Sequence, residues 1–176
     1  MELNRYLIET RGRILSLLEG VPAAVSSEAV NGSWSVDGIV EHLAVVERGS
    51  LVMVKRSLTQ AVAAESAIAE TADKLKLIEK RVARRGSRIE APPTVQPTGR
   101  FGIWPGSLNA FLEAGAKMIG MAEQVSEEYD LRVLEHPVLG KLTLRQWLWF
   151  IAAHSERHAA QIEDHLAGAP NPGLQI

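Results

Sequence analysis

The segment that decides the fold is HPVLGKLTLRQWLWFIAAHSERHAAQI, residues 136–162, because it contains the best-marked helix start in the chain. Thr143 and Gln146 form a T-x-x-Q capping box, in which each side chain can bond the backbone of the other residue. Residues at helical spacing then follow along one face: Leu144, Trp147, Leu148, Ile151, His154, His158, Ile162 and Leu166. Gly168 and Pro170 end the pattern, so we predict one amphipathic helix over about residues 144–167.

This helix presents two histidines where its period requires inward residues. His154 and His158 lie about 40° apart around the helix and about 6 Å apart along it, so both imidazoles can reach one ion. A single inward histidine is more often a hydrogen-bonded core residue than a metal ligand. H-x-x-x-H is also a short pattern that occurs by accident. On this pair alone, a shared metal ion and a hydrogen-bonded core pair both stay open.

Three more segments have the period of amphipathic helices. The first covers about residues 2–19, the second runs from an N-cap at Ser33 or Ser35 to about residue 60, and the third covers about residues 106–128. In the third helix we expect Gly115 to face inward and to admit a close neighbour. The other residues expected on that inward face are Leu108, Leu112, Ile119 and Ala122.

The stretch between the second and third of these helices is long. Residues 61–86 are rich in alanine and predict further helix that ends at Gly86. Residues 87–106 hold four prolines and three glycines, in a connection that could be a lid, a dimer contact or a crossover strap. Only RVL, residues 132–134, and PTV, residues 93–95, could form short strands. We therefore predict an all-α single domain over residues 1–176: a four-helix bundle with a long crossover connection and an extra helix between bundle helices 2 and 3.

The composition excludes several classes of protein. With 19 Lys and Arg against 21 Asp and Glu, the net charge is −2, so we expect neither a nucleic-acid nor a membrane partner. The absence of cysteine rules out disulfides, thiolate ligands and a cysteine nucleophile. Residues 1–15 contain no uninterrupted apolar run, so we expect no signal peptide or membrane span. These features predict a cytoplasmic protein.

A third histidine falls on the inward edge of the second helix. His42 follows Ile39 by three residues, about 10 Å from the start of its helix, and His158 lies about 15 Å from the end of its own. If the two helices are antiparallel neighbours, the three imidazoles therefore lie at similar depth. A bundle-edge histidine bonded to a carbonyl explains His42 equally well. The residues alone leave both interpretations open.

The two remaining histidines are weaker candidates for a metal site. His165 shares the face of His158 and is the rival third ligand, but we expect it to be solvated in the last helical turn. His136 precedes Pro137 in a connection, and we expect it to be exposed. We assign neither histidine to the metal.

Together these features resemble the DinB-like (YfiT-like) family of metal-binding four-helix-bundle proteins. The matching stretches are WSVDGIVEHLAVVE, residues 34–47, and the segment at residues 136–162, which place one histidine early and H-x-x-x-H late. The resemblance covers nearly the whole chain. It implies that a divalent metal ion, zinc or nickel, is held by His42, His154 and His158 near one end of the bundle, with open positions facing a cleft.

The resemblance transfers the site better than the reaction, because one fold hosts several chemistries. The family includes hydrolases and thiol-dependent transferases or isomerases, so it implies a small-molecule substrate and, in the second case, a low-molecular-weight thiol. Without cysteine, the nucleophile must be water or must arrive with the substrate. The alternative is a non-enzymatic binding or regulatory module in which the metal is structural.

Residues around the histidines suggest supporting roles. Gln161 shares the face of His154 and could hold a ligand histidine or contact substrate, although a polar residue at the rim explains it equally well. Glu41 and Glu163 are candidate general bases, whereas Glu47 lies about 140° from His42 around the helix and should face elsewhere. We assign no catalytic base. A homodimer is a further expectation, because some apolar residues of the second helix cannot all face inward: Leu51, Val52 and Met53.

Overall fold

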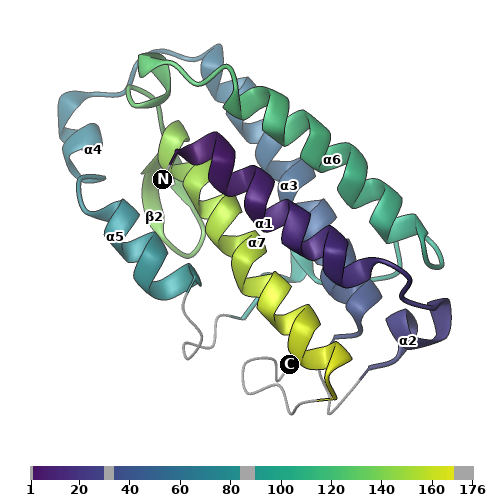
Figure 1. Ribbon diagram of the computed structural model, residues 1–176. Helices are drawn as coiled ribbons and strands as arrows, with labels where there is room; N and C mark the ends of the chain where they lie inside the picture. The colour runs from purple at the N-terminus through teal and green to yellow at the C-terminus, as the bar shows by residue number, and fades with distance from the viewer. Residues whose placement is uncertain (1, 30–33, 84–89, 169–176) are drawn as a thin grey trace.

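A computed structural model describes residues 2–29, 34–83 and 90–168, and four long helices dominate it (Figure 1). These are α1 (Leu3–Leu18), α3 (Val36–Leu58), α6 (Gly106–Ala122) and α7 (Leu144–Leu166). α3 packs mainly against α6 and α1 mainly against α7, while α3–α7 and α1–α6 contacts complete the bundle. The predicted four-helix bundle is confirmed.

The helix starts are fixed by side-chain caps that the sequence already indicated. Ser35 Oγ accepts a hydrogen bond of 3.1 Å from the backbone N–H of Gly38 and so caps α3. At α7, Thr143 Oγ1 accepts from Gln146 N at 3.2 Å, and Gln146 Oε1 accepts from Thr143 N at 3.0 Å. Both halves of the capping box are therefore present, and they set the register of the helix that carries two of the histidines.

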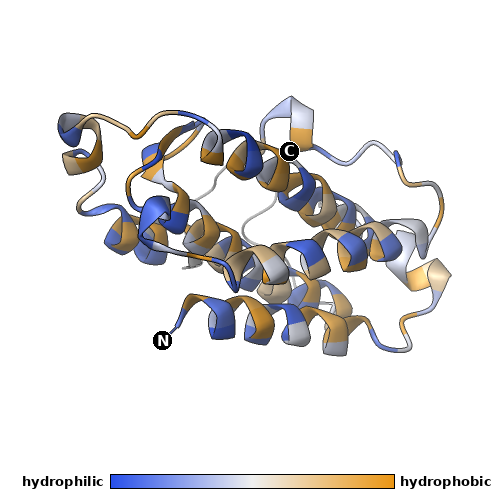
Figure 2. Cartoon of the chain, turned by 90° about the horizontal axis from the view of Figure 1, so that it is seen from above, coloured by the Kyte–Doolittle hydropathy of each residue, from blue (hydrophilic) through white to orange (hydrophobic). Residues whose placement is uncertain are grey.

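The buried apolar residues form two clusters that follow each other along the bundle. Along α7, residues up to Ala153 pack in one cluster and residues from Ala159 onward pack in the other. His154 and His158 lie between these two stretches, so the histidine site occupies a break in the apolar core. Figure 2 shows hydrophobic and hydrophilic residues alternating along the long helices, as expected for amphipathic bundle helices.

The third bundle helix is shorter and turned differently than the sequence predicts. α6 ends at Ala122 rather than near residue 128, and Leu112 is 41 % exposed instead of inward. The buried face is offset by one position and consists of Ser107, Ala110, Phe111, Ala114, Gly115, Met118, Met121 and Ala122. Fully buried Phe111 and the close approach of Arg11 to Gly115 fix this rotation. The predicted inward positions of Gly115 and Ala122 are confirmed.

The crossover between α3 and α6 contains only short helices. α4 (Glu65–Ala69), α5 (Lys74–Ile78) and the π-helical turn η1 (Glu79–Ala83) replace the long helix expected there, and its predicted end at Gly86 lies outside the described residues. In this stretch, some backbone N–H and C=O groups that would bond within a continuous helix bond distant residues instead. Gln146 Nε2 donates to the Thr71 carbonyl at 2.8 Å, and Ala63 N donates to the Leu131 carbonyl at 2.9 Å.

A two-stranded hairpin precedes α7. β1 (Val133–His136) and β2 (Gly140–Thr143) pair antiparallel, and Gly140 adopts a φ of 69° at the turn. The strand predicted at residues 132–134 overlaps β1 at residues 133–134. The strand suggested at residues 93–95 is wrong, because Pro93–Val95 forms the 3-10 helix η2. The remaining short elements are α2 (Ala23–Ser27) and η3 (Glu127–Tyr129). No described helix is long and apolar enough to cross a membrane.

Candidate metal centre

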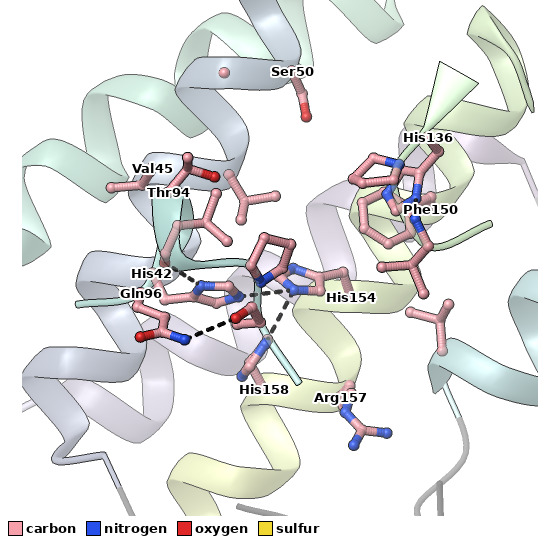
Figure 3. A pocket seen from close by; sticks show the side chains of 18 of the residues that line it. His42, Val45, Ser50, Thr94, Gln96, His136, Phe150, His154, Arg157 and His158 are labelled. Carbon is pink, nitrogen blue, oxygen red and sulfur yellow. Dashed lines mark hydrogen bonds between the residues drawn. The ribbon is translucent and has the colours of Figure 1, made fainter. Parts of the chain in front are cut away.

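The structure brings the three predicted histidines together between α3 and α7 (Figure 3). His154 Nε2 lies 3.1 Å from His42 Nε2 and 3.1 Å from His158 Nε2. One nitrogen from each ring lies within 4.8 Å of the other two. His42 and His158 are buried and His154 is half-buried. The predicted proximity of the three imidazoles is confirmed, while metal binding by them stays a prediction.

The orientation of His42 is set by a backbone carbonyl. His42 Nδ1 lies 2.7 Å from the carbonyl oxygen of Val95, which can only accept, so Nδ1 carries the proton. The lone pair of His42 is therefore on Nε2, the atom that faces the other two histidines. Trp34 packs against the same ring at a centroid distance of 5.0 Å. The sequence could not reveal the Val95 contact, because 53 residues separate the two partners.

Val95 is held in place by a buried carboxylate. Glu41 accepts hydrogen bonds from Thr98 N at 2.7 Å, Gly99 N at 2.8 Å and Arg100 Nε at 3.1 Å. Burial alone would raise the pKa of Glu41, but these backbone and side-chain bonds together lower it. Glu41, a candidate base from the sequence, therefore anchors the strap of residues 92–105 onto α3 instead of facing the histidines.

The protonation of the cluster leaves lone pairs that no neighbouring group satisfies. Burial lowers the pKa values of His154 and His158 well below their usual range, and the nearby charges of the other imidazoles and Arg157 lower them further. All three rings are therefore neutral near pH 7. The Nε2 atoms of His42 and His158 both face Nε2 of His154, so a single proton on His154 Nε2 would have to be shared between their two lone pairs. The Nδ1 atom of His158 has no hydrogen-bond partner.

This donor set fits a divalent cation. Bonds of about 2.0–2.1 Å to one zinc ion place neighbouring nitrogens about 2.9–3.4 Å apart, depending on coordination geometry. The observed Nε2 separations of 3.1 Å lie inside that range. Neutral imidazole is also the form that ligates metals, and a shared cation would satisfy the lone pairs that one proton cannot. The three histidines are thus suited to hold one ion.

Gln161 lies beside this cluster, as its position on the face of His154 predicts. It is buried, and its Oε1 atom has no hydrogen-bond partner. Its side chain is close enough to His158 to raise the pKa of that ring, against the larger lowering by burial. Gln161 is therefore placed to accept a proton carried by Nδ1 of His158, the supporting contact that metal-ligating histidines commonly make.

Two histidines that we expected to be solvated are buried. His165 is 7 % exposed, because its position one heptad after His158 places it on the inward face even in the last turn of α7. His136 is also 7 % exposed, because the hairpin folds its ring back onto Trp147 and Phe150. Both expectations of exposure were wrong. Among the described residues, neither histidine belongs to the metal-competent cluster.

The other two candidate bases also lie away from the imidazoles. Glu47 is buried and forms an ion pair with Arg11 of α1, at 3.2 Å. Glu163 is paired with Arg13 at 2.6 Å on the exposed side of α7. The structure therefore supplies no carboxylate base from the set that the sequence offered.

A cavity of about 360 Å³ opens over the histidine cluster. His42, His154 and His158 line part of it, together with Gln161 and Arg157. Most of the remaining wall is apolar and includes Val46, Met53, Val95, Val138, Leu139 and Phe150. A concave, largely apolar space with a few polar groups is typical of small-molecule sites.

Comparison with known proteins supports both the fold and the family resemblance. A family model described as the DinB superfamily matches residues 6–162. "Uncharacterized protein YuaE" of Bacillus subtilis (strain 168) is 29 % identical over 136 residues, which cover 74 % of this chain and 76 % of that protein. The solved structure of YfiT from Bacillus subtilis, described as "a probable metal-dependent hydrolase with an unusual four-helix bundle topology", aligns with a TM-score of 0.60 at 20 % identity. That alignment covers 96 % of this chain and 87 % of YfiT, and at this identity it shows a shared fold.

Proposed function

We propose that this chain, which belongs to the DinB superfamily, is an enzyme that uses one divalent metal ion to act on a small organic molecule. The family resemblance inferred from the sequence is confirmed by the match over residues 6–162. One observation carries the proposal: the Nε2 atoms of three neutral histidines converge at the wall of an apolar cavity. A closed structural site would instead have a fourth protein ligand and no adjoining cavity.

One set of residues would hold the ion, and another set would hold the substrate. His42, His154 and His158 would hold zinc or nickel through Nε2. The Val95 carbonyl fixes the proton of His42 on Nδ1 and so keeps its Nε2 lone pair directed at the cluster. The apolar wall binds the body of the substrate and keeps bulk water away from the reacting groups.

Hydrolysis is the reaction that this arrangement supports first. A divalent ion with three imidazole ligands and open positions supplies a Lewis acid that activates water at neutral pH. The description of YfiT as a probable metal-dependent hydrolase agrees with this choice. An ester or amide small enough for the cavity is the class of substrate we propose.

A specific observation favours thiol-dependent transfer as the second candidate. Among the cavity-lining residues that the structure describes, Glu90 is the one carboxylate, and it is exposed. A low-molecular-weight thiol needs less help from a protein base than water does, because its pKa is closer to neutrality. The chain has no cysteine that would react in its place.

Metal analysis tests the proposal, followed by an activity screen. Protein purified without an affinity tag should contain close to one divalent ion per chain, and His42→Ala, His154→Ala and His158→Ala should each lose it. His165→Asn is the matched control, since His165 is a buried histidine of the same helix outside the cluster, and it should keep the ion. Equal metal content in all four variants would contradict the proposed site.

The metal-loaded protein is then assayed against small esters and amides, and against electrophiles with a panel of low-molecular-weight thiols. Turnover that disappears in His154→Ala supports an enzyme and identifies the reaction class. Stoichiometric metal without turnover in either screen would favour a binding or regulatory module.

A further inference from the structure

His136 is a fourth histidine in the wall of the same cavity; it is buried, and the proposed metal site gives it no role. Its ring packs against Phe150 at a centroid distance of 4.4 Å and against Trp147 at 5.0 Å. Phe150 in turn lies 5.3 Å from the ring of His154. Figure 3 shows His136 beside Phe150, with His154 between this pair and His42. A ligand that occupies the cavity above His154 can therefore also reach His136.

The hairpin turn fixes the tautomer of this histidine. The backbone N–H groups of Val138 and Leu139 both donate to Nδ1 of His136, each at 3.1 Å. A neutral imidazole has one acceptor nitrogen and one donor nitrogen, so Nε2 must carry the hydrogen. Burial lowers the pKa of His136 to about 4, which keeps the ring neutral near pH 7. His136 is thus a neutral donor with a defined direction.

His136 lines the cavity, and its Nε2–H group is not fully enclosed by protein. In the described parts of the chain, the hydrogen bonds of His136 go to Nδ1, and no acceptor is bonded to Nε2. The surrounding wall is largely apolar, with Val138, Leu139 and Phe150 nearby. A ligand that carries a hydrogen-bond acceptor can bond this N–H group. A ligand without an acceptor displaces the water from the N–H group and leaves it unpaired, so it binds less tightly.

We infer that His136 is a substrate-binding residue whose Nε2–H donates a hydrogen bond to a carbonyl-type oxygen of the bound molecule, away from the three-histidine cluster. The statement that this molecule is a substrate rests on the proposed function. The presence of a hydrogen-bond donor at His136 is independent of that function. The substrate class is thereby narrowed to compact, largely apolar molecules that carry a carbonyl oxygen separated by a short apolar spacer from the group that reacts.

A pair of probes with the same shape isolates this hydrogen bond. Acetophenone and α-methylstyrene differ in having a carbonyl oxygen or a methylene group at the same place. Both are titrated into the protein as purified and followed by protein-detected NMR. His136→Asn is the informative variant, because the asparagine oxygen can still accept from the backbone two and three residues on while the distant donor is lost. Thermal unfolding and metal content of the variant are measured alongside.

The inference predicts that His136→Asn weakens acetophenone binding about fivefold to tenfold and changes α-methylstyrene binding less than twofold. In the unaltered protein, the imidazole Nε2 resonance of His136 should shift on addition of the ketone and not of the alkene, a result that needs no variant. His136→Gln, which keeps a donor near the original Nε2, should restore the selectivity for the ketone.

Equal losses for both probes, no loss for the ketone, or no ketone binding to the unaltered protein would overturn the inference. The inference would also be overturned if the Nε2 resonance of His136 did not shift when the ketone is added. These results are distinguishable from failure of the proposed function. A chain that binds no metal can still select the ketone through His136, and a chain with its full metal content can fail to do so.

Discussion

Two polar clusters use buried residues of α3, about one and a half helical turns apart, and they differ in how their polar groups are paired. In one cluster, Arg11 of α1 pairs with Glu47 of α3. In the other cluster, His42 of α3 faces His154 and His158 of α7. Arg11, Glu47, His154 and His158 each lie where one apolar cluster gives way to the next along their helix, whereas His42 lies among residues of the second cluster.

The Arg11–Glu47 cluster is complete within itself. Arg11 Nη1 donates to Glu47 Oε2 at 3.2 Å, Nη2 donates to the carbonyl of Phe111, and the guanidinium lies 4.0 Å from the centroid of the Phe111 ring. Gly115 makes room for it, since a Cβ at that position would lie 1.5 Å from Arg11 Nη1. The guanidinium thus finds a carboxylate, a carbonyl oxygen and an aromatic face inside the protein.

The histidine cluster is complete only with a partner from outside. Its members are chemically alike, and their Nε2 atoms face one another with no oppositely charged or purely donating group between them. The comparison teaches that burial of polar groups does not by itself mark a functional site. A buried cluster whose members bond one another needs no ligand, whereas a cluster whose lone pairs converge on one point indicates a site for a cation.

The largest effect is expected where the self-contained cluster is broken. Gly115→Ala should destabilise the protein by about 3–5 kcal/mol, because the new methyl group displaces Arg11 and leaves Glu47 buried without its partner. Denaturant unfolding measures the change. The matched control is Gly120→Ala on the same helix, where no atom lies within 4 Å of the new Cβ and the protein should gain about 0.5–1 kcal/mol. Equal stability of the two variants would refute the role of Gly115.

Zinc should stabilise the protein through the histidine cluster alone. Free zinc at about a hundred times its dissociation constant should raise the free energy of unfolding by about 2.7 kcal/mol. Glu47→Gln should keep this increase, because it alters only the other cluster, while His154→Ala should lose it. Thermal unfolding with zinc or with a chelator makes the comparison. An increase that survives in His154→Ala would place the ion elsewhere.

The pH dependence of stability should have opposite signs for Glu47 of the ion pair and for His136 in the wall of the cavity. Burial raises the pKa of Glu47 to about 7, so its contribution is full below the unfolded value of 4.5 and is lost as pH rises through 7. Burial lowers the pKa of His136 to about 4, so its contribution is full above the unfolded value of 6.5 and is lost as pH falls through 4. Each effect is on the order of 1–3 kcal/mol.

Unfolding free energies measured between pH 4 and pH 7 in the presence of a chelator test these signs. Subtracting the profile of Glu47→Gln from that of the unaltered protein should leave a falling curve, and subtracting that of His136→Asn should leave a rising one. Two difference curves of the same sign would contradict the assignment.

The smallest effect is expected from loosening the strap over His42. Glu41→Gln replaces two acceptor oxygens with one and weakens the bonds to Thr98, Gly99 and Arg100 that hold Val95 in place. Zinc affinity should fall about tenfold, as for other lost contacts behind metal-ligating histidines. Competition with a chromophoric chelator measures it. Glu163→Gln, which alters an exposed ion pair on α7, should leave the affinity unchanged.

Helical periodicity predicted the four-helix bundle and the proximity of the three histidines, because both depend on which face of a helix each residue occupies. His154 and His158 lie on a face that the capping box of α7 fixes, and His42 lies on the corresponding face of α3. The burial of His165 follows from the same periodicity, because His165 lies one heptad after His158.

Features that depend on contacts between distant segments could not be predicted from the sequence. The Val95 carbonyl reaches His42 across 53 residues, and Gln146 of α7 interrupts the expected helix by binding the Thr71 carbonyl across 75 residues. His136 was expected to be exposed because it precedes a proline, but the hairpin turns its ring inward onto Phe150. No local pattern records such tertiary contacts.

The most direct test is anomalous diffraction at the zinc absorption edge, using crystals of zinc-loaded protein. We predict one strong peak bonded to Nε2 of His42, His154 and His158, at about 2.0–2.1 Å from each. A peak bonded to fewer than three of these nitrogens, or no peak between α3 and α7, would contradict the account.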